Sequence, residues 1–342
     1  MSAAADGAAS DGELPVPGAA VRYLSVPAGA ALKLCRLAAT IVPGTSALSS
    51  PESVCLADFG HGKVAAAPRP RQERKLLMEV VPLGSAAEIA VLAADTVEVV
   101  VRRRPAAVLG LATGSTPLPA YRELIRRHKA GAGPSYAAVT CFNLDEYVGL
   151  PTPEGGVHEQ SYRATIAREL TDDLGISPDQ VNGPDPSPDG LPTAGERYEA
   201  LIAKAGGVDV QFLGVGSDGH LAFNEPGSSL ASRTRIKTLT AQTRKDNARF
   251  FGSLDEVPNH VLTQGLGTIL EARHLLLIAT GAGKAGAVAA AVEGPVSASC
   301  PASVLQLHPH VTVLLDPAAA SRLDRLGYYR EVYAAKPAWQ GL

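Results

Sequence analysis

The sequence lacks the features that would mark it for a membrane, a disulfide framework or a nucleic acid. No apolar run in its 342 residues approaches the length needed to span a bilayer. The formal net charge of −3 gives no sign of a binder of nucleic acids or other polyanions. Its four cysteines, Cys35, Cys55, Cys141 and Cys300, show neither pairing nor metal-ligand spacing. They indicate reduced, buried thiols in a cytoplasmic protein.

The first 77 residues differ in composition from the rest of the chain. They are rich in alanine, serine and proline, end in a basic cluster and show little periodicity. Such a segment predicts a disordered or poorly packed extension. A regular α/β pattern begins at Met78, so we expect residues 78–342 to form the functional domain and residues 1–77 to be dispensable.

From Met78 on, strand-like and helix-like segments alternate. This pattern predicts an α/β fold with an open, doubly wound, mostly parallel sheet of Rossmann-like type and helices on both faces. The expected strands are Ala106–Ala112, Ala137–Leu144, Val208–Val215, Leu275–Thr280 and Val311–Leu315. Four of these five place polar, charged or glycine-rich residues at their C-terminal ends. Ligands bind open α/β sheets at that edge, so we expect one shared site there.

Two strand-to-helix turns are candidates for binding a phosphate. The first contains Gly114, Ser115 and Thr116, and Pro117 suits the first position of a helix capped by either hydroxyl. Its N–H groups and hydroxyls could bind an anion at the positive end of the helix. Lys284 follows a similar turn, where a cation is unfavourable unless an anion binds beside it. Ordinary capping uses the same residue types, so a purely structural role stays open.

Residues suited to proton transfer follow the second and third expected strands. Asp145 and Glu146 form an adjacent acid pair, while Asp218 and His220 follow a glycine turn, with Glu225 five residues further. An imidazole between two acids can be oriented and kept ready to pass protons near neutral pH. Each of these residues alone is also typical of a structural turn or loop. The acid pair alone is typical of an exposed turn. Together they indicate catalysis.

Two further polar segments have competing interpretations. The stretch 228–237 contains several cations and is either a solvated basic face or an anion site distinct from the catalytic one. His308 and His310 resemble a metal-binding pair, but no carboxylate or cysteine accompanies them. We therefore expect no metal site and interpret both histidines as loop residues.

These motifs resemble those of a known family. The segments LGLATGSTP, FNLDEYVGL, HEQSY, GVGSDGHLAFNEPGSSLASRTRIKTLT, NARFF and LQLHP are similar to those of glucosamine-6-phosphate deaminases, also called glucosamine-6-phosphate isomerases. The similarity extends from about Met78 to about Tyr329. It implies conversion of glucosamine 6-phosphate and water to fructose 6-phosphate and ammonia, in amino-sugar catabolism, without a metal or organic cofactor.

The resemblance also implies a role for each matching residue. Asp145 is then the general base that moves a proton between C2 and C1 of the sugar. His220 assists opening of the sugar ring, and Asp218 and Glu225 flank and orient it. The segment His158–Tyr162 corresponds to a mobile lid. The residues implied to bind the substrate phosphate are Gly114, Ser115, Thr116, Arg249 and Lys284.

Some bacterial members of this family are hexamers that N-acetylglucosamine 6-phosphate activates at a second site between subunits. The matching candidate allosteric residues are Ser228, Arg235, Lys237, Thr238 and Tyr328. The resemblance thus implies a homo-oligomer that responds to this compound, and no membrane or nucleic-acid partner. Activation itself requires two states with different affinities for the effector.

Two other functions compete with a deaminase. A hydrolase of the 6-phosphogluconolactonase type shares the fold, but it would not explain Asp145 together with the whole motif from FNEP to KTLT. A sugar-phosphate sensor without catalysis would usually carry a DNA-binding segment, and the chain is not basic. The complete set of acids and histidine favours an enzyme.

Overall fold

A seven-stranded parallel sheet forms the centre of the molecule. The computed structural model describes residues 77–150, 157–337 and 340–341, so the predicted extension lies outside the described residues except for Leu77. The strand order is β1-β10-β9-β6-β2-β3-β5, and all neighbours are parallel. The strands are β1 (Leu77–Pro82), β2 (Val108–Leu111), β3 (Thr140–Asn143), β5 (Val181–Asn182), β6 (Val210–Leu213), β9 (Leu275–Ala279) and β10 (His310–Leu315). The predicted α/β fold is confirmed.

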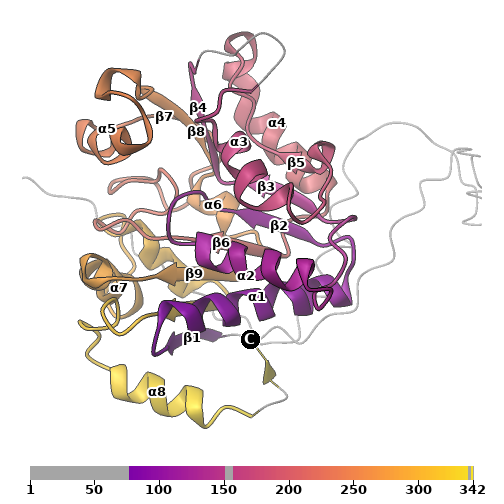
Figure 1. The fold of residues 1–342 in the computed structure, drawn as a ribbon. Coiled ribbons are helices and arrows are strands. Elements are labelled where there is room, and N and C mark those ends of the chain that lie inside the picture. The colour runs from indigo at the N-terminus through magenta and orange to yellow at the C-terminus, as the bar shows by residue number, and fades with distance from the viewer. Residues whose placement is uncertain (1–76, 151–156, 338–339, 342) are drawn as a thin grey trace, which may run out of the picture. The chain divides into compact units, whose positions relative to one another are not determined.

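Helices cover both faces of this sheet. The helices are α1 (Ala86–Arg103), α2 (Leu118–Lys129), α3 (Tyr162–Ile166), α4 (Leu191–Lys204), α5 (Ala241–Asn247), α6 (Leu266–Ile269), α7 (Ala285–Val292) and α8 (Leu326–Ala334). Figure 1 shows α1 and α2 packed side by side on one face. Connections through α4, α6 and α7 cross the sheet in the opposite direction, so right-handed crossovers place these helices on the other face. Strands β2, β6 and β9 are buried at every position, which explains their mostly apolar sequences; Gln211 in β6 is the polar exception.

The order of the strands fixes where a ligand can bind. From β2 the chain proceeds to β3 and β5 at one edge, whereas from β6 it proceeds to β9 and β10 toward the other. Strands β2 and β6 are neighbours, so their C-terminal ends form a topological switch point, where open α/β sheets leave a crevice. The turn at 113–117 follows β2 and the loop at 214–220 follows β6. The two segments singled out in the sequence therefore border the same crevice.

A second, smaller sheet was not predicted. It is antiparallel, with the order β4 (Asp145–Val148), β8 (His260–Thr263) and β7 (Arg235–Thr238). Tyr147, Leu239 and Val261 form its own small core. The interpretation of Asp145 and Glu146 as an exposed acidic turn is therefore wrong. Both belong to β4, and the pairing with β8 buries them.

Two local predictions need correction. Neither Ser115 nor Thr116 caps α2, because Pro117 occupies the cap position itself and no side chain bonds to the helix start there. His310 is not a loop residue, since it begins β10 and stacks on His274 with ring centroids 3.7 Å apart. His308 is buried and structural: its Nε2 faces the carbonyl oxygen of Ala272 at 2.8 Å.

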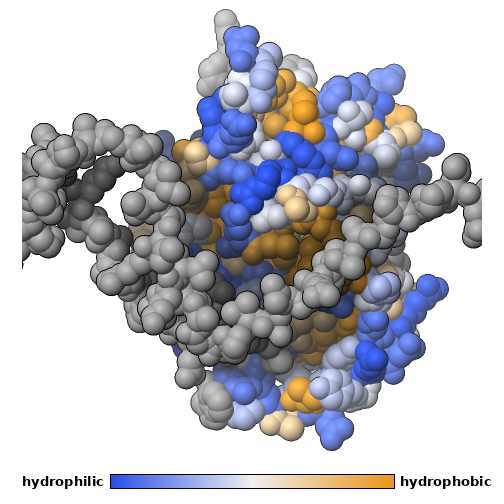
Figure 2. Space-filling model, turned by 180° about the vertical axis from the view of Figure 1, so that it is seen from behind, coloured by the Kyte–Doolittle hydropathy of each residue, from blue (hydrophilic) through white to orange (hydrophobic). Residues whose placement is uncertain are grey.

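The remaining exclusions concern metals, disulfides and membranes. Within the described residues, Cys141 and Cys300 are free and buried, while Cys35 and Cys55 lie outside them. The same residues contain no group of three metal-ligating side chains. On the face seen in Figure 2, hydrophilic residues surround an apolar middle. No helix in the part of the chain that the structure describes is long and apolar enough to cross a membrane.

Gly110 tests the packing between β2 and β6 at the switch point. A Cβ atom on Gly110 would lie 2.0 Å from Oε1 of Gln211, its fully buried cross-strand partner. We expect Gly110→Ala to lower the free energy of unfolding by about 1–3 kcal/mol, because such overpacking forces neighbours to shift. Urea denaturation measures this change. The control is Gly327→Ala in α8, where a Cβ meets nothing within 4 Å; equal losses in both variants would contradict the account.

Candidate active site

The loop after β6 holds Asp218 and His220 in contact, as predicted. Nδ1 of His220 lies 2.7 Å from Oδ1 of Asp218, and the backbone N–H of His220 donates to the same oxygen at 3.2 Å. Nδ1 of His220 is buried and makes no well-aligned hydrogen bond within the described residues. Its contact with the carboxylate of Asp218 is therefore chiefly electrostatic. Asp218 thereby orients the ring and leaves Nε2 as the nitrogen available for proton transfer.

At Gly216, the backbone of this loop leaves no room for a side chain. The N–H of Gly216 donates to the carbonyl oxygen of His220 at 3.0 Å, which closes a tight turn. A Cβ on Gly216 would lie 2.2 Å from the imidazole of His220 and 2.6 Å from Oδ1 of Asp218. Glycine at 216 is therefore a condition for the Asp218–His220 contact.

Asn224 anchors the continuation of this loop. Its side chain is fully buried; Nδ2 donates to the carbonyl oxygens of Leu221 and Gln264 at 3.0 and 2.8 Å, and Oδ1 accepts from Arg235 at 3.0 Å. Between the bonded residues, Ala222 has a φ of 51°, a strained value for a residue with a side chain. Asn224 carries no separate prediction, although it lies within the FNEP motif. The signal that could have identified it is an asparagine in a loop, because its amide can bind several backbone groups.

Asp145 is the buried acid of the site. Its side chain is 5% exposed, and within the described residues its carboxylate accepts no hydrogen bond. Burial, and secondarily the negative charge of Glu146, raises the pKa of Asp145 well above the ordinary value. A carboxyl group that is desolvated and lacks donors is a stronger base than one in water, as a general base requires.

Strand β8 connects Asp145 to the loop that carries His220. Thr263 pairs with Asp145 across the small sheet, and its hydroxyl accepts from the N–H of Phe223 at 3.2 Å. The N–H of Gln264 donates to the carbonyl oxygen of Leu144 at 2.8 Å, while its own carbonyl accepts from Asn224. The end of β3 and the 214–225 loop are thus bound to the same two residues.

Glu225 has other partners than the sequence predicts. Its Oε1 accepts from the hydroxyls of Thr243 at 2.5 Å and Thr240 at 3.3 Å, at the start of α5. The implied flanking contact with His220 is not among its hydrogen bonds in the described chain. The structure therefore ties Glu225 to α5, and an effect of Glu225 on His220 stays a prediction.

The predicted phosphate-binding residues come together only in part. A cavity of about 40 Å³ lies between the starts of α1 and α2, and Ser115 and Thr116 line it together with Thr280, which the sequence did not single out. Gly114, Arg249 and Lys284 are not among its lining residues. Lys284 ends the turn that follows β9, and the Arg249 guanidinium lies 4.7 Å from the centroid of its neighbour's ring, Phe250.

The candidate allosteric residues also fall into two places. Arg235, Lys237 and Thr238 lie on β7, and Ser228, which is buried with no hydrogen-bond partner for its hydroxyl, lies in the preceding loop. Tyr328 lies on α8, which packs against β1, and its side chain is 61% exposed. Figure 1 shows α8 and β7 at opposite ends of the molecule, so one chain does not bring Tyr328 to the other four.

The segment predicted as a lid is anchored at its second half. The hydroxyl of Ser161 accepts from the N–H of Ala164 at 3.0 Å and caps α3. Tyr162 packs against Tyr147, with ring centroids 4.6 Å apart, and stacks on Phe223. Aromatic contacts thus join this segment to β4 and to the loop of the FNEP motif. The mobility of the segment His158–Tyr162 stays a prediction.

Comparisons with known sequences agree with these motifs. A family model for glucosamine-6-phosphate isomerases/6-phosphogluconolactonase matches residues 84–314. Glucosamine-6-phosphate deaminase of Arthrobacter sp. (strain FB24) is 62% identical over 265 residues, which is 78% of this chain and 100% of the relative. That of Mycolicibacterium smegmatis is 59% identical over 266 residues, with the same coverage.

Comparisons with solved structures give the same fold. A monomeric glucosamine-6-phosphate deaminase matches with a TM-score of 0.68 and 41% identity, covering 72% of this chain and 100% of that chain. A 6-phosphogluconolactonase from Trypanosoma cruzi matches with a TM-score of 0.58 and 22% identity over 73% and 98% of the two chains, which shows a common fold alone. Together with the sequence identities, these matches show that the chain belongs to the glucosamine-6-phosphate deaminase family.

Proposed function

We propose that this chain converts glucosamine 6-phosphate and water to fructose 6-phosphate and ammonia. The observation that carries the proposal is the buried carboxylate of Asp145, left without hydrogen-bond donors beside a loop that presents an oriented histidine. Relatives named glucosamine-6-phosphate deaminase that are 55–62% identical to this chain support the same reaction. The activity is assigned to residues 78–342, and free, buried Cys141 and Cys300 suit a cytoplasmic location.

The reaction begins with opening of the sugar ring. A proton leaves the hydroxyl on C1, the bond between C1 and the ring oxygen breaks, and the ring oxygen gains a proton. Nε2 of His220 can accept and return a proton, while Asp218 keeps the ring in place. The product of this step is the open-chain aldehyde.

Asp145 performs the isomerisation. Its carboxylate removes the hydrogen on C2, and the electron pair of that bond forms a double bond between C1 and C2. The π electrons of the C1 aldehyde move to its oxygen, which takes up a proton. Return of a proton to C1 leaves an imine at C2. Water then adds to this imine and ammonia departs, which gives the ketone of fructose 6-phosphate and balances the overall reaction.

The phosphate is assigned to the turn after β2 and to two cations. N–H groups and hydroxyls of Gly114, Ser115 and Thr116 lie before α2, where the helix dipole favours an anion. Arg249 and Lys284 supply charge, and Arg249 can bind two phosphate oxygens at once. The lining of the described cavity contains only part of this set, and we expect the bound phosphate to contact Arg249 and Lys284 as well.

Ammonia release from glucosamine 6-phosphate tests the proposal, with 6-phosphogluconolactone assayed in parallel. We expect ammonia and fructose 6-phosphate in equal amounts without added metal. Hydrolysis of the lactone without ammonia would instead assign the hydrolase activity. Binding of sugar phosphate without turnover of either compound would assign a sensor.

Replacement of Asp145 by asparagine separates catalysis from stability. We expect Asp145→Asn to abolish exchange of the C2 hydrogen with solvent while substrate binding persists, since the amide cannot accept the proton. Folding raises the pKa of Asp145, so its stabilising contribution falls as the pH rises from the ordinary aspartate range through the raised value. The variant should therefore be more stable at neutral pH, on the order of 1–3 kcal/mol. NMR measures the exchange of the C2 hydrogen, and thermal melts at several pH values measure the stability. Full turnover by Asp145→Asn would refute the assignment of Asp145 as the base.

A methyl group at Gly216 tests the role of the loop. We expect Gly216→Ala to lower kcat on the order of a hundredfold, because the new Cβ displaces the imidazole of His220. Gly214→Ala is the matched control, since a Cβ there meets nothing within 4 Å. Steady-state kinetics of the two purified variants decide the question. Similar rates in both would show that the position of His220 does not limit turnover.

We further infer that the chain assembles into a homo-oligomer, for which the hexamer is the family precedent. We also infer that N-acetylglucosamine 6-phosphate activates this oligomer. It would bind to Ser228, Arg235, Lys237 and Thr238 of one subunit and to Tyr328 of a neighbouring subunit. The match of residue types supports this, although the solved relative described as monomeric shows that deaminases also work alone. We expect sigmoidal rates that the acetylated sugar phosphate makes hyperbolic. Hyperbolic rates that it leaves unchanged, in a monomer by ultracentrifugation, would remove the inference.

A further inference from the structure

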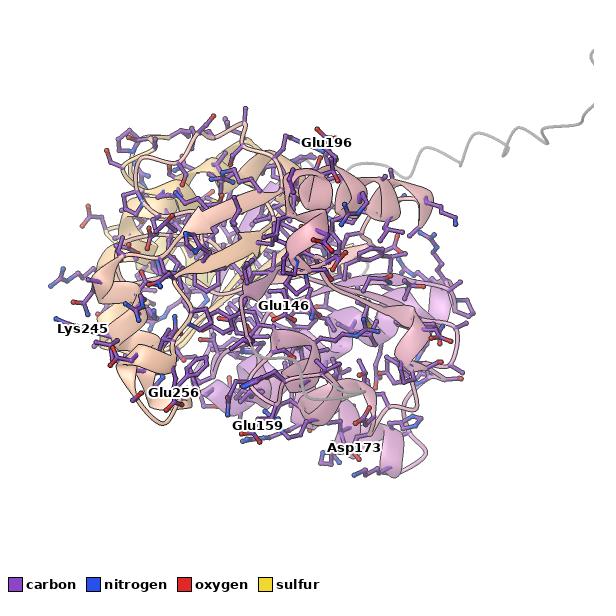
Figure 3. The ribbon with its side chains drawn as sticks, turned by 90° about the horizontal axis from the view of Figure 1, so that it is seen from above. Glu146, Glu159, Asp173, Glu196, Lys245 and Glu256 are labelled. Carbon is purple, nitrogen blue, oxygen red and sulfur yellow. The ribbon has the colours of Figure 1, made fainter. Side chains whose placement is uncertain are left out.

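Glu146 is a buried carboxylate that the proposed reaction does not use. Its side chain is 4% exposed, and Figure 3 shows it inside the molecule, whereas Glu159 and Asp173 lie at the edge. Oε1 accepts from the N–H groups of Tyr147 and Tyr162, and Oε2 accepts from that of Arg163, all at 2.9 Å. Its charge is thus distributed over three backbone donors, while the carboxylate of the adjacent Asp145 accepts none.

The donors show what Glu146 holds together. Tyr162 and Arg163 are the first two residues of α3, and their N–H groups have no acceptor within the helix. A carboxylate at this end also interacts favourably with the helix dipole. Glu146 itself lies on β4 directly after Asp145, so one side chain fixes the start of α3 to the strand that bears the base. The side chains of Tyr162 and Tyr147 also contact each other, which adds a second link between α3 and β4.

Besides β8, α3 is the element that contacts β4 most in the described chain, so this junction contributes to the orientation of β4. β4 is an edge strand of the small sheet and, within the described residues, pairs with β8 on one side. Successive side chains of a strand point to opposite faces, so Asp145 and Glu146 point away from each other. A tilt of β4 that frees Glu146 from α3 would therefore move the carboxylate of Asp145 as well.

We propose that Glu146 is a positioning residue, which ties α3 to β4 and thereby holds Asp145 in place for proton transfer. The proposal rests on the proposed function, because it concerns the removal of the C2 hydrogen. Glutamine at this position can still accept at one oxygen, but its NH₂ group would face the N–H of Arg163. A glutamine variant therefore loosens the junction and also removes the charge beside Asp145.

The test compares Glu146→Gln with the wild type and with Glu196→Gln, which removes a charge from an exposed residue of α4. The rate and its primary isotope effect are measured with glucosamine 6-phosphate deuterated at C2, as a function of pH. We expect kcat to fall on the order of tenfold or more and the isotope effect to rise, because proton transfer becomes slower than the other steps. A loss of folded enzyme alone would lower kcat but would not alter the isotope effect.

The pH profile provides a second readout. Loss of the charge at 146 should move the acid limb of kcat to lower pH, since that charge opposes ionisation of Asp145. The other groups that face the pair are Tyr147, Tyr162, Tyr198 and Arg163, and all are retained in the variant. Glu196→Gln should leave both readouts unchanged.

A variant that keeps the charge covers the case in which Glu146→Gln does not fold. Glu146→Asp retains the carboxylate but is one methylene too short to reach α3 as before. It should raise the isotope effect without moving the acid limb. If Glu146→Gln and Glu146→Asp fold and show the same isotope effect as the wild type, the positioning proposal is overturned. Ammonia release by the wild type would still support the proposed function. Absence of ammonia from the wild type would overturn both.

Discussion

The desolvation of one carboxylate is the constraint on which the rest of this structure depends. Asp145 lies buried beside Glu146, and its carboxylate accepts no hydrogen bond from the described chain. Such a group destabilises the folded protein, and it can be retained only if its surroundings are fixed by other interactions. The neighbouring acid shows the contrast, because Glu146 is equally buried but accepts from three backbone N–H groups. Of these two adjacent residues of β4, Asp145 is thus the candidate for catalysis and Glu146 stabilises the structure.

The two sheets explain how that arrangement is held. The large sheet places the turn after β2 beside the loop after β6, where the topology leaves a crevice. The small sheet continues directly from β3 and carries Asp145 to the same edge. Thr263 and Gln264 at the end of β8 then bind both the strand of Asp145 and the loop of His220.

The sequence predicts those parts of the fold that local composition determines. β2 and β9 are recognisable because strands buried on both faces are apolar runs, and β6 is recognisable although Gln211 interrupts its apolar residues. β4 is not recognisable, since its sequence DEYV is polar and becomes buried only through pairing with a strand more than 100 residues away. The same applies to Glu225, whose partners at 240 and 243 depend on how α5 packs. Motifs identify the catalytic residue types, but long-range contacts decide which of them touch.

The fate of the hydrogen on C2 of the substrate tests the account most directly. Glucosamine 6-phosphate deuterated at C2 is turned over completely, and the product is analysed by NMR and mass spectrometry. If a buried carboxylate removes this hydrogen, the product is fructose 6-phosphate with the deuterium at C1 or lost to water. A hexose 6-phosphate that retains deuterium at C2, with oxygen in place of nitrogen there, would mean direct displacement of ammonia. That result would contradict the role of Asp145 as the base.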